Sequence, residues 1–389
     1  MKKLKVLMLT SSYPIEGSNL GPFVKNIVKA LISKNVEVGV MIFSTTKKYR
    51  EYEQDGARIY EYPYTFIFPP RLHKNMGLIP SIKSSFFAKL ELMGYFFSTR
   101  KYLVKICKKY DIVHAHWLLP SGLIACTLKN KIKKPIITTA WGGEFHLPKY
   151  FFIKNILNYV NRKSDSVITV SKYMLTKARD YDLDTSRMKV ISNSIDVDQF
   201  SLKRKKSNKI IIGTARRLVP EKRIKDLIEA ISLLSERNKK KLELWIIGDG
   251  PERKKLELMI RNKDMSKMTK FCGMINHDRM PSILSKIDIH VNPSVQEGMA
   301  TANLESMAAG CCAIATEGYG NDEVIINNIT GKLYKPRDVK SLSTILEDLL
   351  NNPKKMEKLA KKGKQFVNKN FNSKKIVNEY IKEYNSMHQ

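Results

Sequence analysis

The feature that most constrains the fold is an alternation of short apolar runs with amphipathic stretches. Residues 4–10 and 36–43 have the apolar composition of buried strands, and residues 21–34 between them place apolar side chains at the spacing of one helix face. Further apolar runs follow at residues 111–117, 135–141, 166–171 and 188–193. Strands that alternate with helices predict a doubly wound parallel sheet, in which ligands bind beyond the carboxyl ends of the strands.

The alternation stops at residues 199–209, which are polar, charged and without apolar periodicity, and then begins again. The second set of apolar runs occupies residues 209–215, 242–250, 270–274, 287–294, 308–318 and 332–336. A chain of 389 residues is long enough for two cores. We therefore expect two doubly wound domains that face each other across a cleft, at residues 1–198 and 199–372, and a terminal helix at 373–389 that packs back on the first domain.

The chain is strongly basic, with 69 lysine and arginine residues against 37 acids and a net charge of +32. The excess is spread over both halves, so it does not come from a basic tail. Residues 71–109 are a local exception, because nine basic residues and a single acid, Glu91, are mixed there with aromatic residues. This composition predicts contact with an anionic membrane leaflet. The alternative is an ordinary pair of helices with a solvated lysine face.

No run approaches the roughly 18 to 20 apolar residues that span a bilayer, and we expect a cytoplasmic protein. Five cysteines form no CxxC pair, which favours buried thiols in a reducing compartment: Cys107, Cys126, Cys272, Cys311 and Cys312. The seven histidines show no metal-ligand spacing. We expect neither a protein-bound metal nor a cofactor.

The segment that begins at Gly213, GTARRLVPEKRIKDLIEA, indicates an anion site. A strand end delivers Arg216 and Arg217, and Lys222 lies just before a helix. An arginine fork and a lysine at such a turn suit a diphosphate and would neutralise charge on a departing nucleoside diphosphate. The alternative is a solvated turn, since paired cations are common in so basic a chain.

A second segment, NPSVQEGMATANLESMAAG, places two carboxylates near the start of a helix. Gly298 lets the backbone approach a ligand closely. The helix N-terminus that follows suits a diphosphate, with amides from Met299, Ala300 and Thr301. Glu297 and Glu305 can accept hydrogen bonds from sugar hydroxyls. The alternative is one acid that complements the helix dipole and one that is solvated.

Together these segments resemble the retaining GT-B glycosyltransferases of family 4, the group 1 glycosyltransferases. EGMATANLE matches the E-x7-E motif of that family, and GTARRLVPEK resembles its G-R-L-x-x-x-K-G segment. Other segments resemble the family in the same order along nearly the whole chain: DIVHAHW, TAWGGEF, ISNSIDVDQF, WIIGDGPER and KFCGMI.

The resemblance implies a GT-B fold of two Rossmann-like domains and a set of donor residues. Arg217 and Lys222 would hold the diphosphate, Glu305 the ribose and Glu297 the donor hexose. Donor contacts are also implied for Gly248, Ile275, Gly298, Met299, Ala300 and Thr301. Members of the family retain the anomeric configuration and generally need no metal. The implied route is front-face attack, in which the acceptor approaches the anomeric carbon on the same face from which the leaving phosphate departs.

On the acceptor side the resemblance implies contacts from Gly21, His116, Trp141, Gly142, Gly143 and Glu144. His114 and His116 share one strand face, and we expect His116 to be functional, together with Glu297, Arg217 and Lys222 as the catalytic set. The sequence departs from the family at Trp141, where a histidine is usual, and at Glu144, where aspartate is usual. GYGNDE, residues 318–323, matches the family only loosely.

The expected function is transfer of a hexose from a nucleoside-diphosphate sugar, with a UDP-sugar favoured. The expected acceptor is a lipid-linked saccharide or polysaccharide at the inner membrane face of a bacterium, as in capsule or exopolysaccharide assembly. The alternatives are a non-catalytic GT-B paralogue and a nucleotide-sugar epimerase. A nucleic-acid-binding protein is less favoured, because the charge is diffuse and no recognition module is present.

Overall fold

The computed structural model describes residues 3–15, 21–65, 86–147, 150–204 and 207–388, with the backbone alone at residues 86–90 and 146. The chain folds into two compact units. Unit 1 comprises Met1–Asn193 and Ser373–Gln389, and unit 2 comprises Ser194–Asn372. The change of unit at residue 193 comes five residues before the domain boundary expected after residue 198.

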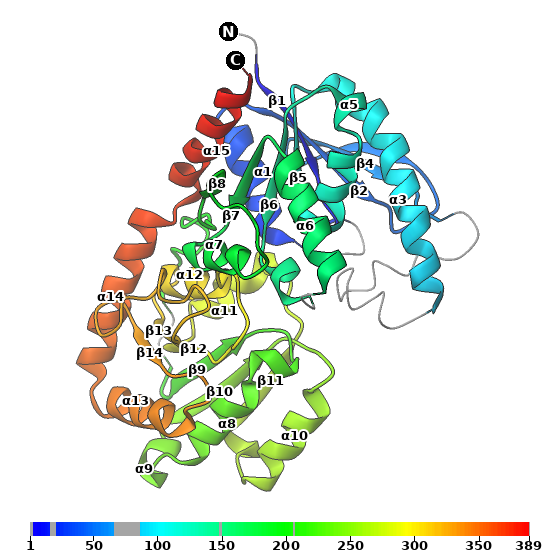
Figure 1. Cartoon of the computed structure of the whole chain (residues 1–389). Coiled ribbons are helices and arrows are strands. Elements are labelled where there is room, and N and C mark those ends of the chain that lie inside the picture. Colours follow the sequence, from blue (N-terminus) through cyan, green and yellow to red (C-terminus); the bar gives the residue numbers. More distant parts are fainter. Residues whose placement is uncertain (1–2, 16–20, 66–85, 148–149, 205–206, 389) are drawn as a thin grey trace. The chain divides into compact units, whose positions relative to one another are not determined.

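Unit 1 is built on an eight-stranded sheet with the order β3-β4-β2-β1-β5-β6-β7-β8 (Figure 1). The strands are β1 (Lys5–Leu9), β2 (Glu37–Phe43), β3 (Arg50–Gln54), β4 (Ala57–Tyr62), β5 (Ile112–His116), β6 (Ile136–Ala140), β7 (Ser166–Thr169) and β8 (Met188–Val190). All neighbours are parallel except β3, which is antiparallel to β4. The predicted parallel sheet is confirmed, but the β3–β4 hairpin was not predicted.

The helices of unit 1 are α1 (Pro22–Ser33), α3 (Phe86–Ile106), α4 (Leu123–Thr127), α5 (Lys129–Ile132), α6 (Phe151–Lys163), α7 (Lys172–Arg179) and α15 (Ser373–His388). The crossovers from β1 to β2 and from β5 to β6 run in opposite directions along the sheet. Right-handed connections therefore place α1 and α4 on opposite faces. α15 packs against α1, and α4 packs against both α3 and α6.

The terminal helix α15 completes the core of unit 1. Tyr380 and Tyr384 are buried, and the hydroxyl of Tyr384 lies 2.7 Å from Nδ1 of His114 in β5. This contact joins residues that are 270 positions apart in the sequence.

Unit 2 is built on a six-stranded parallel sheet with the order β11-β10-β9-β12-β13-β14. Its strands are β9 (Ile210–Ala215), β10 (Leu242–Ile247), β11 (Thr269–Gly273), β12 (Ile289–Asn292), β13 (Cys312–Thr316) and β14 (Lys332–Tyr334). Its helices are α8 (Ile224–Ser232), α9 (Glu236–Lys239), α10 (Arg253–Asn262), α11 (Met280–Leu284), α12 (Thr301–Ala308), α13 (Val339–Asn351) and α14 (Pro353–Asn370). Each apolar run that predicted a strand in the second half contains one.

The strand order of each unit creates one point where the chain changes direction across the sheet. In unit 2 this switch point lies between β9 and β12, and in unit 1 it lies between β1 and β5. The connections leave such a pair of strands toward opposite faces, which opens a crevice at their carboxyl ends. The two switch points are therefore the places to examine for ligand binding.

Among the described residues, no helix is long and apolar enough to cross a membrane. All five cysteines are free, and four are buried. The prediction of a buried thiol is wrong for Cys272, which is half-buried because it lies on β11 at the edge of the sheet. Of the predicted membrane patch, residues 71–85 lie outside the described residues, and residues 86–106 form α3.

Candidate active site

Two cations lie close to one carboxylate at the switch point of unit 2, and the charge of a third acts on one of them. Lys222 lies in a short 3-10 turn, Pro220–Lys222, beyond β9. Its Nζ donates to Oε1 of Glu297 at 2.8 Å and to the carbonyl of Gln296 at 2.9 Å. Nη1 of Arg216 lies 3.7 Å from the same Oε1 atom. The structure thus brings together the two segments that sequence analysis singled out.

The charges of this cluster do not cancel. Burial alone would raise the pKa of Glu297, but Lys222 and Arg216 lower it to about 2. Burial lowers the pKa of Lys222, and the like charges of Arg216 and Arg217 lower it further against the attraction of Glu297. Three cations and one carboxylate leave an excess of two positive charges. This excess suits a ligand with at least two negative charges, such as a diphosphate.

Arg216 is the arginine that lies close to the carboxylate of Glu297. The Arg216 side chain is largely buried, and its Nε makes no hydrogen bond to any atom that the structure describes. Arg217 is exposed and acts on Lys222 through its charge. The sequence places both arginines at the anion site, but the resemblance to the family assigned the phosphate role to Arg217 alone because of its place in the motif. The signal for Arg216 was available, since the two arginines follow the same strand.

Two glycines explain how the arginine segment packs against β10. The backbone of Gly248 has a φ of +126°, and a Cβ atom there would lie 1.9 Å from the carbonyl oxygen of Arg216. A Cβ atom at Gly250 would lie 2.4 Å from the carbonyl oxygen of Leu218. Larger residues would push the arginine segment away from the sheet. Gly248, predicted to contact the donor, therefore positions Arg216 through the backbone.

The helix α12 begins next to the cluster, as predicted. It starts at Thr301, after Gly298 and the buried residues Met299 and Ala300. No side chain caps this end of the helix among the described residues. The first amides of a helix carry a partial positive charge and lack intrahelical partners, so they add to the anion-binding character of the switch point.

Glu305 lies one turn into α12 and is buried. Its Oε1 is 2.9 Å from Nε2 of His277, in the 3-10 turn His277–Arg279 that follows β11. Ile275, the residue predicted to lie beside the base, is half-buried in the same connection. His277 was not among the predicted site residues, although it follows Ile275 by two residues.

A buried network of amides lies beneath the cluster. Nη2 of Arg216 donates to Oδ1 of Asn303 at 3.5 Å, and Nδ2 of Asn303 donates to Oδ1 of Asn321 at 2.9 Å. Asn321 also accepts from Asn292 and donates to the carbonyl of Thr316 at 2.9 Å. The side chain of Asn321 therefore ties together α12 and the ends of β12 and β13. It belongs to the GYGNDE segment, in which sequence analysis identified no network residue.

The lowered pKa of Glu297 predicts acid sensitivity. A carboxyl whose pKa falls on folding stabilises the fold above its unfolded pKa of 4.5, and this contribution is lost as the pH falls through about 2. We expect unit 2 to lose on the order of 3 kcal/mol from this group between those values. Urea unfolding at several pH values will measure it. In Glu297→Gln this part of the pH dependence of the unfolding free energy should disappear. A variant whose unfolding free energy changes with pH as steeply as that of the wild type would contradict the prediction.

At the switch point of unit 1, both predicted histidines are buried. Nε1 of Trp141 donates to Nδ1 of His116 at 3.3 Å, and Nε2 of His116 lies 3.1 Å from the sulfur of Met8. Burial, followed by the neighbouring His114, lowers the pKa of His116 well below its usual value. The imidazole is neutral at physiological pH, and its contacts are internal. A role for His116 in transfer stays a prediction.

Glu144 is also buried and holds its own loop. One carboxylate oxygen accepts from the amide of Leu118 at 3.0 Å, and the other accepts from the amide of Gly142 at 2.9 Å. Gly142 has a φ of +104°, and Gly143 is exposed with open space around it. Each carboxylate oxygen of Glu144 thus accepts a hydrogen bond from a backbone amide. The neighbouring Gly143 is the exposed part of this predicted acceptor loop.

Gly21 and Trp141 lie near the same strand ends. Gly21 precedes α1 with a φ of +75°, and a Cβ atom there would lie 2.3 Å from the carbonyl oxygen of Ser12. The ring of Trp141 lies 4.3 Å from that of Phe23, the second residue of α1, and 6.0 Å from that of Trp117. The indole rings of Trp117 and Trp141 are half-buried at this edge.

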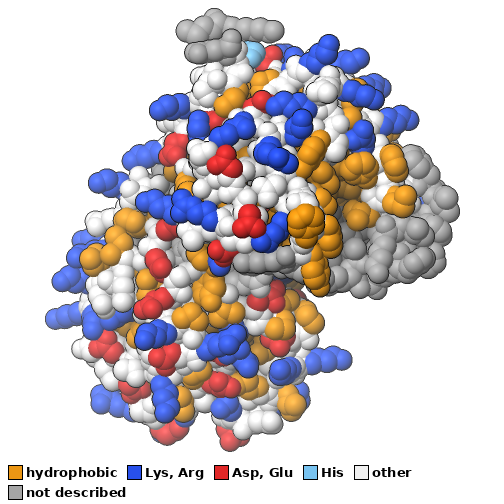
Figure 2. All heavy atoms as spheres, viewed as in Figure 1, with side chains coloured by type: hydrophobic (Ala, Val, Ile, Leu, Met, Phe, Trp, Pro, Cys, Tyr) orange, Lys and Arg blue, Asp and Glu red, His pale blue; other side chains and the backbone are white. Residues whose placement is uncertain are grey.

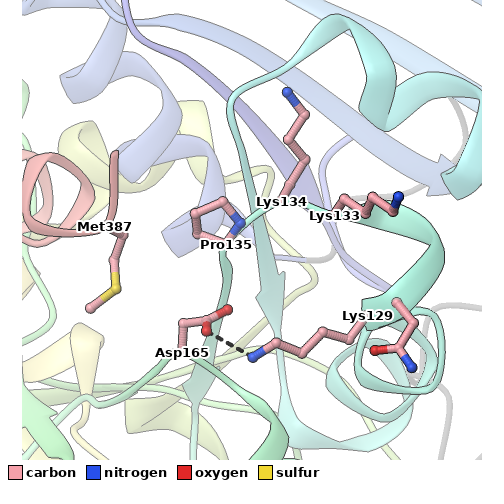
Figure 3. A pocket seen from close by; sticks show the side chains of 7 residues that line it. Lys129, Lys133, Lys134, Pro135, Asp165 and Met387 are labelled. Carbon is pink, nitrogen blue, oxygen red and sulfur yellow. Dashed lines mark hydrogen bonds and ion pairs between the residues drawn. The ribbon is translucent and has the colours of Figure 1, made fainter. Parts of the chain in front are cut away.

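A surface hollow elsewhere in unit 1 is not part of this site. It is lined by Lys129, Asn130, Lys133, Lys134, Pro135, Asp165 and Met387 (Figure 3). Pro135 precedes β6 and Asp165 precedes β7, so the hollow lies at the amino edge of the sheet, opposite the switch-point crevice. Lys129 is already paired with Asp165 at 2.7 Å. Within the described ranges, no group of histidine, cysteine and acidic residues is arranged to hold a metal ion.

Comparison with known proteins identifies the class. Residues 20–199 match the family model described as Glycosyltransferase Family 4, and residues 196–366 match that of Glycosyl transferases group 1. An uncharacterized glycosyltransferase of Methanocaldococcus jannaschii is 27% identical over 390 residues, which cover 99% of each chain. The N-acetyl-alpha-D-glucosaminyl L-malate synthase of Bacillus anthracis is 26% identical over 284 residues, 69% of this chain and 73% of that protein.

Solved structures share the fold. The Anabaena protein HepE, solved in complex with UDP-glucose, matches with a TM-score of 0.78 at 16% identity, over 98% of this chain and 100% of its own. The chain is therefore a glycosyltransferase with the GT-B fold. Its N-terminal half is of the family 4 type and its C-terminal half is of the group 1 type, as the resemblance of the sequence predicted.

Proposed function

We propose that the protein transfers a hexose from a UDP-sugar to an acceptor hydroxyl with retention of the anomeric configuration. The observation that supports this most is the cluster that Arg216 and Lys222 form with Glu297 at the switch point of unit 2, with the charge of Arg217 acting on Lys222. A diphosphate would satisfy both its excess charge and the uncapped start of α12. The complex of the similarly folded HepE with UDP-glucose supports a nucleotide-sugar donor.

In this proposal Glu305 binds the ribose and Ile275 lies beside the base, while Glu297 contacts the hexose. The acceptor oxygen forms the new bond to the anomeric carbon on the face from which the phosphate oxygen departs, and the proton passes to that phosphate. The cations stabilise the charge on the leaving diphosphate. Since side chains supply this positive charge, we expect transfer without an added divalent metal and without a cofactor.

We place the acceptor, a lipid-linked saccharide or growing polysaccharide, at the inner face of the cell membrane, with the protein peripheral to it. The net charge of +32 supports association with an anionic surface. The exposed Gly143 and the half-buried Trp141 are the acceptor-side groups that a ligand can reach in unit 1. Capsule or exopolysaccharide assembly is the setting that we propose.

A panel of UDP-, GDP- and ADP-sugars tests the donor site by thermal shift and nucleotide release, with and without bacterial lipid extract. We expect one donor to raise the melting temperature, and we expect Glu305→Ala and Arg216→Ala to abolish the shift. Lys240→Ala, which removes an exposed cation of the same unit, should leave it unchanged. If no nucleotide shifts the melting temperature of the wild type, the chain is a non-catalytic GT-B protein.

His277→Ala is expected to weaken donor binding about tenfold, because a hydrogen bond to a charged group contributes about 1.5 kcal/mol or more. The imidazole holds one oxygen of Glu305, so its loss frees the carboxylate from the position that we assign to ribose binding. Calorimetric titration with UDP checks this result. His277→Gln, which can still donate to Glu305, should recover part of the affinity. Equal losses in both variants would exclude a positioning role.

A further inference from the structure

Large apolar side chains are exposed together at two places in unit 1. Their exposed fractions are 61% for Met93, 63% for Phe97, 61% for Tyr150, 80% for Phe151 and 58% for Phe152. Met93 and Phe97 belong to α3, and the other three surround the start of α6. Figure 2 shows hydrophobic side chains gathered on this side of unit 1. We call these five residues the aromatic tip.

Both parts of the aromatic tip lie toward the same edge of the sheet. α3 precedes β5 and α6 precedes β7, and both strands belong to the parallel part of the sheet. A helix that leads into a parallel strand begins at the carboxyl edge. α4 contacts both α3 and α6, so the two helices lie on one face. The aromatic tip thus lies at the edge that also holds Trp141 and Gly143.

The two helices that carry the aromatic tip hold an excess of positive charge. α3 and α6 together include seven lysine and arginine residues and one acid. This acid, Glu91, is buried. Apart from Lys154, which pairs with Asp182, the cations of the two helices are therefore not balanced by exposed carboxylates of the same helices. One-sided positive charge is complementary to an anionic surface.

A single stripe of α3 combines both features. Met93, Phe97, Lys101 and Lys105 follow one another at intervals of four residues, and all four are exposed. With a rise of 1.5 Å per residue, Lys101 lies about 6 Å from Phe97 along the helix. Apolar faces of interfacial helices enter the boundary of headgroups and acyl chains by roughly 5–10 Å. Aromatic insertion would thus bring the lysines to the level of lipid phosphates.

We propose that the aromatic tip inserts into an anionic lipid leaflet, with Lys101 and Lys105 against the headgroups. This inference rests on the proposed function, since it names the surface that brings the acceptor side of unit 1 to a membrane-bound acceptor. Charge complementarity favours lipid over a second copy of this chain, because the same cations would face each other across a symmetric contact of this surface.

Vesicle sedimentation tests the proposal on the full chain. The probes are phosphatidylcholine vesicles with and without roughly one-third phosphatidylglycerol. Phe151→Ser with Phe152→Ser should weaken binding to the anionic vesicles at least about tenfold, because two exposed aromatic side chains lose their insertion. Lys101→Glu with Lys105→Glu should weaken it about tenfold or more, and only with the anionic lipid. Leu233→Ser with Leu258→Ser, which removes exposed leucines of unit 2, is the matched control.

Several results would overturn the proposal. The first is that the phenylalanine variant binds anionic vesicles as strongly as the wild type does. The second is that the leucine control loses as much vesicle binding as the phenylalanine variant, and the third is that the wild type binds neither kind of vesicle. A wild-type dimer that the phenylalanine variant converts to a monomer would instead identify a second copy as the occupant. Thermal shift with UDP-sugars separates the two proposals. If a UDP-sugar raises the melting temperature but the protein does not bind vesicles, only the membrane insertion of the aromatic tip is contradicted. If the protein binds vesicles but no UDP-sugar raises the melting temperature, only the proposed sugar transfer is contradicted.

Discussion

Lys222→Met is expected to lower the rate of sugar transfer by a factor of about 10² to 10³. The ammonium group lies 2.8 Å from Glu297 in the cluster that the two motif segments build, and it would neutralise charge on the departing diphosphate. Loss of this cation removes an interaction that strengthens as the donor bond breaks, so kcat should fall more than donor affinity. Initial rates and UDP titration of the same preparation will measure both quantities.

A second variant separates catalysis from stability. Lys222→Met leaves Glu297 buried with weaker compensation, which can destabilise unit 2. Lys222→Met combined with Glu297→Gln removes both charges and should restore most of the melting temperature while transfer stays impaired. Transfer at the wild-type rate in either variant would contradict the assignment of the diphosphate site to this cluster.

Asn321→Ala is expected to destabilise unit 2 by about 3 kcal/mol or more. The side chain is fully buried, and its removal leaves polar groups of Asn292, Asn303 and Thr316 without these partners. Each unsatisfied buried group costs about 1 to 3 kcal/mol. The displacement of Asn303 should also loosen Arg216 and weaken UDP binding. Chemical unfolding measures the first effect and titration the second.

Asn262→Ala is the matched control, because Asn262 is an exposed asparagine at the end of α10. Its free energy of unfolding should change by no more than about 0.5 kcal/mol. Asn321→Asp keeps the shape but replaces the donor to Thr316 with a buried carboxylate oxygen that faces this carbonyl, so its loss should be at least as large as that of Asn321→Ala. If Asn321→Ala unfolds like the control, the amide network does not stabilise the site.

Much of the fold could be predicted from apolar periodicity. Each expected strand exists, since a buried parallel strand requires a continuous apolar run and the sequence marks it directly. The β3–β4 hairpin was missed because β3, REYEQ, is polar and lies at the sheet edge, where burial does not select apolar residues. Its signal is the turn, Asp55-Gly56, where both residues adopt positive φ.

The site was predictable only where a motif fixes the backbone. Lys222 and Glu297 come together because a strand end and the start of a helix determine their positions, and Glu305 lies one turn into that helix. Which of two adjacent arginines turns inward depends on packing against Gly248, which residue spacing does not reveal. His277 and Asn321 are contacts between segments distant in sequence. A single sequence offers no pairing information for them.

The path of the chain between the two units has a consequence for synthesis. Unit 2 is continuous in sequence, whereas unit 1 needs α15, which follows the whole of unit 2. Until α15 has been translated, His114 lacks Tyr384 and the α1 surface lacks its covering helix. A nascent chain can therefore complete unit 2 first, while part of the core of unit 1 is still uncovered. Premature termination within α15 should consequently leave the core of unit 1 exposed. Chaperones and proteases should then recognise unit 1 rather than the truncated end of the chain.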